Sequence, residues 1–173
     1  DTLRQALDVI AGGELWEMRR RRPRTRPAPL VVLADISGSM SSYSRMLLHF
    51  VHALSHADLR VHSFVFGTRL TPISRALRQR DPDIAVASVA RAVQDWSGGT
   101  RLGDALRELG DTWSRRGVTR GATDVILSDG WDRGDPTDLA LQMARLSRVA
   151  HRVVWVNPLK ASPGYAPHHP VGD

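Results

Sequence analysis

One short stretch of the chain places a carboxylate and two hydroxyls at alternating positions. Asp35, Ser37 and Ser39 form an Asp-x-Ser-x-Ser pattern directly after the apolar run at residues 30–34. A buried strand that ends at this point would present three oxygen ligands on one turn of the chain. Hard divalent cations prefer oxygen ligands of this kind. The stretch therefore predicts part of a Mg²⁺-type site.

Two further polar residues stand where they could complete such a site. Thr100 follows Gly98-Gly99, and Asp129 follows a short apolar strand expected at residues 124–127. Ligands of open α/β sheets bind outside the carboxyl ends of the strands. We therefore expect two carboxylates and three hydroxyls to converge there and to bind Mg²⁺, with Mn²⁺ as the alternative. Zinc is not expected, because the set contains neither His nor Cys.

The elements that must position these residues alternate along the chain. Strands are expected where apolar or alternating runs end in turn residues, and helices where apolar residues recur every three to four positions. The expected strands cover residues 30–34, 60–66, 70–73, 124–127 and 151–156, and helices are expected within residues 43–54, 82–93, 102–113 and 136–146. This order predicts an α/β doubly wound fold, with a mainly parallel sheet, helices on both faces and a short antiparallel edge strand.

Composition divides the chain into three parts. Residues 1–27 are expected to hold a short helix, with apolar residues at positions 3, 6, 7 and 10, and an arginine- and proline-rich linker. Residues 28–160 are expected to form the globular domain, and residues 161–173 a poorly ordered tail. The sequence lacks an initiator Met, and we expect it to be a fragment of a longer protein.

The net charge of +6 comes from one segment. Six arginines fall within residues 19–26, and without them the chain has 18 basic and 18 acidic residues. Such a run is more often a solvated linker than a recognition element. Nucleic-acid binding through it remains an alternative, weakened by the lack of interleaved aromatic residues. The absence of cysteine excludes disulfides and thiol catalysis, and no apolar run is long enough to span a bilayer.

The five site residues, with their spacing and expected elements, resemble the von Willebrand factor A (VWA) domain and its metal-ion-dependent adhesion site (MIDAS). The resemblance extends from Ala28 to Leu159. It implies that the three hydroxyls bind the metal directly, while the two carboxylates act partly through water. Neutral direct ligands leave much of the cation's charge uncompensated, so an acidic side chain of a partner would complete the octahedron. The resemblance thus implies a binding domain and not an enzyme.

A narrower resemblance lies in the second half of the domain. Residues 130–136 and 153–159, together with the arginine-rich run before the first strand, resemble the CoxE-like branch of VWA proteins. Members of that branch are cytoplasmic bacterial proteins that work beside a MoxR-type AAA+ ATPase. They are tied to the maturation of aerobic carbon monoxide dehydrogenase and related molybdenum enzymes. The resemblance implies a cytoplasmic adaptor whose partners are such an ATPase and a client metalloenzyme.

The site residues also allow two other interpretations. Asp35, Thr100 and Asp129 could serve only as helix caps and turns. A carboxylate after the first strand also occurs in haloacid-dehalogenase-like phosphatases, although these need a second Asp where Ser37 stands. A Mg²⁺-dependent phosphohydrolase is therefore the alternative function. Neither a Gly-x-Ser-x-Gly elbow nor a phosphate-binding loop with lysine is present.

Four residues near the expected site are candidate partner contacts: Trp96, Trp131, Met40 and Arg101. For the two tryptophans, a position beneath the site loops is an equally good interpretation.

Three other patterns have structural explanations. Asp135 in the tripeptide Arg133-Gly134-Asp135 precedes a proline, which predicts a helix N-cap and not an adhesion motif. Trp113 and Trp155 lie on core patterns. Three histidines share one expected helical face, which predicts a solvent-facing side more readily than a transition-metal site. They are His49, His52 and His56.

Overall fold

The computed structural model describes residues 27–57, 59–93 and 99–161, so the expected N-terminal helix and nearly all of the linker and tail lie outside the described residues. Within them, five strands form one sheet in the order β3-β2-β1-β4-β5. They are β1 (Leu30–Asp35), β2 (Val61–Phe66), β3 (Leu70–Pro72), β4 (Thr123–Leu127) and β5 (Arg152–Val156). Only β3 is antiparallel to its neighbour. The predicted fold class is confirmed.

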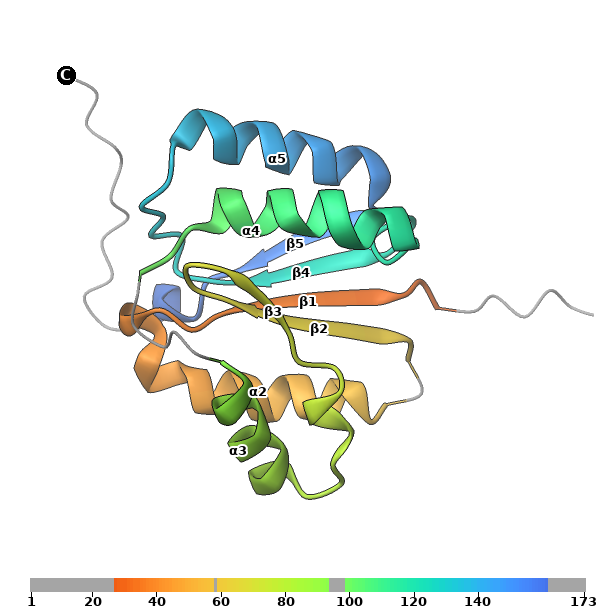
Figure 1. Cartoon of the computed structure of the whole chain (residues 1–173), viewed down its shortest axis with the longest axis vertical. Helices are drawn as coiled ribbons and strands as arrows, with labels where there is room; N and C mark the ends of the chain where they lie inside the picture. Colours follow the sequence, from red (N-terminus) through yellow and green to blue (C-terminus); the bar gives the residue numbers. More distant parts are fainter. Residues whose placement is uncertain (1–26, 58, 94–98, 162–173) are drawn as a thin grey trace, which may run out of the picture.

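Helices cover both faces of the sheet (Figure 1). One face carries α2 (Ser41–Ser55) and α3 (Pro82–Ala92), and the other carries α4 (Leu102–Glu108) and α5 (Pro136–Val149). Asp81 and Asp135 cap α3 and α5 by accepting backbone N–H groups, and each precedes a proline, as the sequence predicts. Asp135 is therefore a helix cap, which accounts for the adhesion-like tripeptide.

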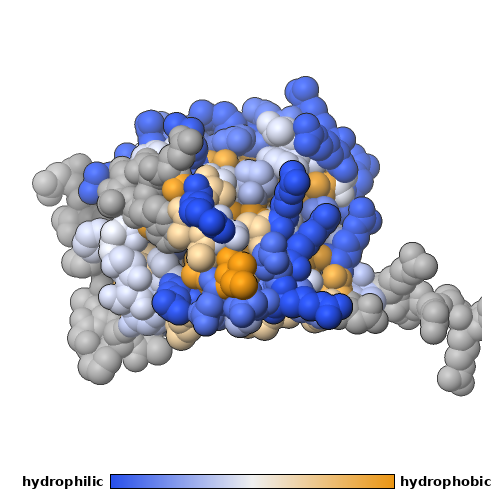
Figure 2. Space-filling view, turned by 60° about the horizontal axis from the view of Figure 1, so that its bottom comes forward, coloured by the Kyte–Doolittle hydropathy of each residue, from blue (hydrophilic) through white to orange (hydrophobic). Residues whose placement is uncertain are grey.

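The α2–α3 side exposes more apolar surface than the sequence pattern predicts. Met46 and Phe50 of α2 are 57% and 49% exposed, although the spacing of apolar residues 43, 46, 47, 50, 51 and 54 predicts that both lie on the face toward the core. The helix buries Leu47, Leu48 and Val51 instead. The face that contacts the sheet is therefore rotated relative to the centre of the predicted apolar face. Figure 2 shows apolar atoms at the surface of this side, surrounded by hydrophilic side chains.

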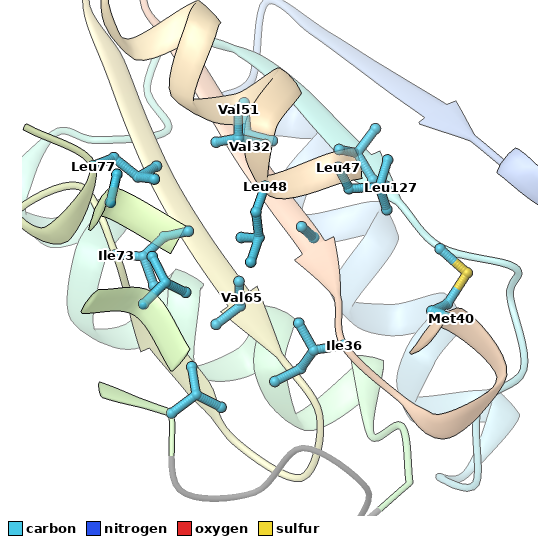
Figure 3. Packing of buried hydrophobic residues seen from close by; sticks show 14 residues of the cluster. Val32, Ile36, Met40, Leu47, Leu48, Val51, Val65, Ile73, Leu77 and Leu127 are labelled. Atoms are coloured by element: carbon cyan, nitrogen blue, oxygen red, sulfur yellow. The ribbon is translucent and has the colours of Figure 1, made fainter. Parts of the chain in front are cut away.

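The middle strand β1 is buried on both faces. Val32 and Ala34 belong to the cluster beneath α2 and α3, while Val31 and Leu33 belong to the cluster beneath α4 and α5. Figure 3 shows the first cluster, in which α2 side chains such as Leu48 point toward the strands. Strands buried on both faces read as continuous apolar runs, which is why this one was predictable. Its last residue therefore emerges from a tightly held element.

The three histidines on or just after α2 differ in exposure, since His52 is buried, His49 is half-buried and His56, which follows the end of the helix, is exposed. His52 is only 8% exposed, and its Nε2 lies 2.8 Å from the carbonyl oxygen of Gln79. The His56 Nε2 lies 3.0 Å from the carbonyl oxygen of Leu77. These rings fasten α2 to the segment before α3, and the prediction of solvent exposure is wrong for His52. Among the described residues, no group of three or more His, Cys, Asp or Glu side chains could hold a metal ion.

Parallel strands bring distant loops to one edge of the sheet. Ala34 of β1 pairs with Leu127 of β4, so the loops that follow these two strands leave the sheet side by side. The loop that leads into α4 reaches the same edge, where the Arg101 N–H donates to the Gly67 carbonyl after β2. None of the helices in the described ranges is long and apolar enough to span a lipid bilayer.

Candidate metal centre

Asp35 lies at the centre of the candidate site. Its side chain is fully buried at the end of β1. Oδ1 accepts the Ser37 backbone N–H at 2.8 Å, and Oδ2 accepts the Ser128 hydroxyl at 2.7 Å. The Thr100 hydroxyl lies 3.4 Å from both oxygens. Groups from three separate loops thus meet on one carboxylate.

The two serines of the pattern lie beside each other. A 3₁₀ turn over Gly38–Met40 follows Ser37 and is closed by the Met40 N–H donating to the Ser37 carbonyl. This turn brings Ser37 Oγ and Ser39 Oγ to 3.1 Å. Ser37 is buried and Ser39 is exposed, so the pair runs from the interior toward solvent. Hydroxyl oxygens in this arrangement can act as neutral metal ligands.

Asp129 carries a buried oxygen without a partner. Its side chain is 8% exposed, and Oδ1 accepts the Trp131 N–H at 3.0 Å. Oδ2 is buried and accepts no hydrogen bond. Burying a carboxylate oxygen without a hydrogen bond is costly, and a nearby cation or its bound water would remove that cost. The donor set therefore fits a divalent cation.

The charges of the two carboxylates, Asp35 and Asp129, also favour a bound cation. Burial raises the pKa of the Asp35 carboxyl, the hydrogen bonds from Ser37 and Ser128 lower it, and the charge of Asp129 raises it again. Two buried carboxylates repel each other unless positive charge lies between them. A divalent cation would supply that charge.

The alternative that these residues only form turns is correct in part. Asp35 and Asp129 each accept the N–H group two residues further along the chain, which is a local turn contact. Thr100 does not cap the helix that follows it, since its hydroxyl points toward Asp35. Turn formation explains one oxygen of each carboxylate. It does not explain why the hydroxyls of Thr100 and Ser128 both lie against the Asp35 carboxylate.

Asp132 is a supporting residue that the sequence interpretation missed. Its carboxylate accepts the N–H groups of Leu102 and Gly103 at 3.1 and 3.4 Å, and that of Gly134 at 3.1 Å. It therefore caps α4 from a loop 30 residues away, while Arg101 at the cap position provides no side-chain bond. The sequence signal that pointed to a distant cap is that no residue at the start of α4 provides a capping side chain of its own.

Replacing Asp132 by Ala is expected to lower the free energy of unfolding by about 1–2 kcal/mol, because three backbone N–H groups lose their acceptor. Mg²⁺ affinity should fall about tenfold, since Thr100 loses the support of the adjoining helix start. Urea denaturation and calorimetric Mg²⁺ titration measure the two effects. Asp132→Asn is the matched control, because it keeps an acceptor oxygen, and equal losses in both variants would contradict the capping role.

Two more residues hold the loop that carries Asp129. Ser128 donates to Asp35, as described above, and its carbonyl accepts the Trp155 indole N–H at 3.0 Å. The Trp155 ring also lies 3.6 Å from the position that a Cβ on Gly130 would take. Trp155 is 39% exposed on the edge strand β5, so its expected core position is wrong. Its role is to support the loop.

The candidate partner contacts divide into three groups. Met40 is fully buried in the cluster beneath α2, so a surface contact is not open to it and that expectation is wrong. Arg101 is exposed and forms an ion pair with Asp104 at 3.1 Å. Trp131 is 63% exposed and lines a pocket of about 370 Å³ beside Ser37 and Thr100. Trp96 lies outside the described residues, and partner binding by the surface residues remains a prediction.

Comparison with known proteins identifies the family of this chain. A family model for "VWA domain containing CoxE-like protein" matches residues 1–172. The chain belongs to this family. As the sequence resemblance implied, the CoxE-like chain carries the VWA fold. Comparison with curated proteins gives no match.

Solved structures agree on the fold. The CoxE-like chain is similar to proximal thread matrix protein 1 from the mussel byssus, with a TM-score of 0.52, 15% identity and coverage of 76% of this chain. A second structure of that protein, described as having a zinc-occupied MIDAS motif, gives the same TM-score of 0.52 and the same 15% identity. The match covers 37% of the mussel protein, so the CoxE-like chain corresponds to well under half of its length. At this identity the likeness establishes the fold alone.

Proposed function

We propose that this domain binds a divalent cation, with Mg²⁺ favoured, and uses it to hold an acidic side chain of a partner protein. The ligands are Asp35, Ser37, Ser39, Thr100 and Asp129. The observation that carries the proposal is the convergence of three loops on the buried Asp35 carboxylate. The unpartnered Asp129 oxygen and the zinc-occupied motif of the mussel protein support it.

Burial of Asp35 favours binding over hydrolysis. A phosphohydrolase that used this loop would need a carboxylate that reaches the substrate. Asp35 has no exposed surface, and both of its oxygens already face donors from Ser37, Ser128 and Thr100. The exposed end of the site is a serine hydroxyl, which leaves the cation open to an incoming anionic ligand. We therefore infer a protein-binding role and no catalytic one.

The proposed partners rest on the family resemblance. CoxE-like proteins are expected to act in the cytoplasm as adaptors of a MoxR-type AAA+ ATPase, in the maturation of a metalloenzyme such as aerobic carbon monoxide dehydrogenase. The family match supports this assignment for the present chain. The metal centre would then receive a carboxylate from either the ATPase or the client.

Replacing Thr100 by Ala tests the proposed site directly. Mg²⁺ affinity is expected to fall more than tenfold, because a neutral ligand is lost from a buried position. Thr100→Ser keeps the hydroxyl and should retain most of the affinity. Isothermal titration calorimetry with Mg²⁺ measures both. Saturable binding that is the same in both variants would place the ion elsewhere.

The adaptor role requires a partner test as well. The purified domain should retain the ATPase or the client from the native host in Mg²⁺ and release it in EDTA. Retention that does not change with EDTA would contradict a metal-bridged contact, even if the ion binds.

A further inference from the structure

Arg133 lies at the rim of the metal centre and is fixed to the loop of Thr100. The Arg133 backbone N–H donates to the Thr100 carbonyl at 2.9 Å. Its side chain covers Gly99, since a Cβ on that glycine would lie 3.0 Å from Arg133 Cδ and 3.1 Å from Cζ and Nε. Arg133 and Thr100 line the same pocket. The guanidinium is therefore held beside a proposed metal ligand.

Gly99 creates the space for this arrangement. Its φ of +90° falls in the left-handed region, which side chains other than glycine rarely adopt. Any side chain there would also displace the arginine. The loop conformation and the arginine position thus depend on the same residue.

No aspartate or glutamate among the described residues forms an ion pair with the Arg133 guanidinium. Most of the described arginines share this property, and what distinguishes Arg133 is its position in the pocket beside Thr100. The neighbouring Asp132 carboxylate is occupied by backbone N–H groups. A positive charge next to a cation site opposes metal binding, so its place here calls for an anion that contacts both.

We propose that Arg133 is a second contact for the partner's carboxylate, an inference that rests on the function proposed above. One carboxylate oxygen would bind the metal, and the other would accept a hydrogen bond from the guanidinium. An amide offers one oxygen and an NH₂ group, and that NH₂ would face the guanidinium donors. Arg133 therefore selects Asp or Glu over Asn or Gln at the same metal. The exposed Trp131 forms the adjoining wall of the pocket.

The test uses two readouts that should move in opposite directions. Arg133→Ala is expected to bind Mg²⁺ about three- to tenfold more tightly, because a repelling charge is removed. The Mg²⁺-saturated variant should bind the peptide acetyl-Gly-Asp-Gly-amide at least fivefold more weakly than the unaltered domain. The matching Asn peptide should bind both proteins equally weakly. Calorimetry measures the ion, and NMR titration measures the peptides.

Controls separate this role from a structural one. Arg69→Ala removes another exposed arginine at the same end of the sheet, outside the pocket, and should change neither readout. If Arg133 only supported the loop, its removal would weaken Mg²⁺ and peptide together, which would overturn the inference. Unchanged Asp-peptide binding in Arg133→Ala would do the same.

Three further outcomes show which part of the proposal fails. Tighter binding of a phosphoserine peptide than of the Asp peptide would overturn the carboxylate assignment. Absence of Mg²⁺ binding by the unaltered domain would overturn the proposed function, and the role of Arg133 with it. Normal Mg²⁺ binding with no response to Arg133→Ala would overturn the role of Arg133 alone.

Discussion

Asp35→Asn is expected to weaken Mg²⁺ binding by at least about 100-fold. The substitution keeps the size of the side chain and removes the negative charge at the centre of the site. Charges about 4 Å apart at an effective dielectric constant of about 20 interact by about 4 kcal/mol, which exceeds the 2.7 kcal/mol or so of a hundredfold change. Calorimetric titration of both proteins with Mg²⁺ measures the loss.

The same substitution should stabilise the protein without metal. Asp35 is a fully buried carboxylate near a second one, Asp129, and its neutral replacement removes that repulsion. In EDTA the variant should therefore melt at a higher temperature, and Mg²⁺ should no longer raise its melting temperature. A variant that melts lower in EDTA and still gains stability from Mg²⁺ would contradict the proposed site.

Asp124→Asn is expected to raise the free energy of unfolding by about 4 kcal/mol at pH 8 and to have little effect near pH 4. Asp124 lies in β4 opposite Val31 and Val153, and it is fully buried. Neither of its carboxylate oxygens has a hydrogen-bond partner. Burial raises the pKa of Asp124 to about 7.

The direction of this pH effect on the free energy of unfolding follows from proton binding. The folded protein keeps the Asp124 proton up to about pH 7, whereas the unfolded chain releases it near the ordinary value of 3.8. Stability is therefore greatest below the lower value and falls as the pH rises to about 7, by about 1.4 kcal/mol per unit. Asn resembles the protonated acid in shape and cannot ionise, so the variant avoids this loss.

Urea denaturation at several pH values measures the difference between the two proteins. The unaltered domain should lose stability relative to the variant from pH 4 to pH 7, and the difference should then stay constant. A difference that does not change with pH would show that the pKa of Asp124 is the same in the folded and the unfolded protein, which would contradict the prediction.

The residues of the candidate metal centre could be picked out from the sequence because their types and spacing form local patterns. Asp35, Ser37 and Ser39 follow an apolar strand, and Thr100 and Asp129 each stand at the end of a loop or strand that the sequence marks clearly. The parallel pairing of β1 and β4 then brings the loops of Asp35 and Asp129 side by side, whereas Thr100 reaches the same edge on the loop before α4. Helix caps such as Asp135 were predictable for the same reason, since donor and acceptor are two residues apart.

Contacts between distant segments could not be predicted in this way. Asp132 caps a helix 30 residues before it, and no local pattern predicts such a contact. The ring of His52 is buried because the chain after β3 returns to meet α2. The exposure of Met46 could not be predicted, because a wide apolar stripe does not indicate which half of it contacts the sheet. These positions depend on tertiary neighbours.

The middle position of β1 has a mechanical consequence. The strand is hydrogen-bonded along both sides, to β2 and to β4, and the turn of the candidate metal centre follows its last residue. A pull applied at the turn after Asp35 and resisted at Leu30 would run along the covalent backbone of β1. The hydrogen bonds to β2 and β4 lie across this direction and would not have to break. Under the proposed function, a pull by a bound partner would therefore reach Leu30 without opening the sheet.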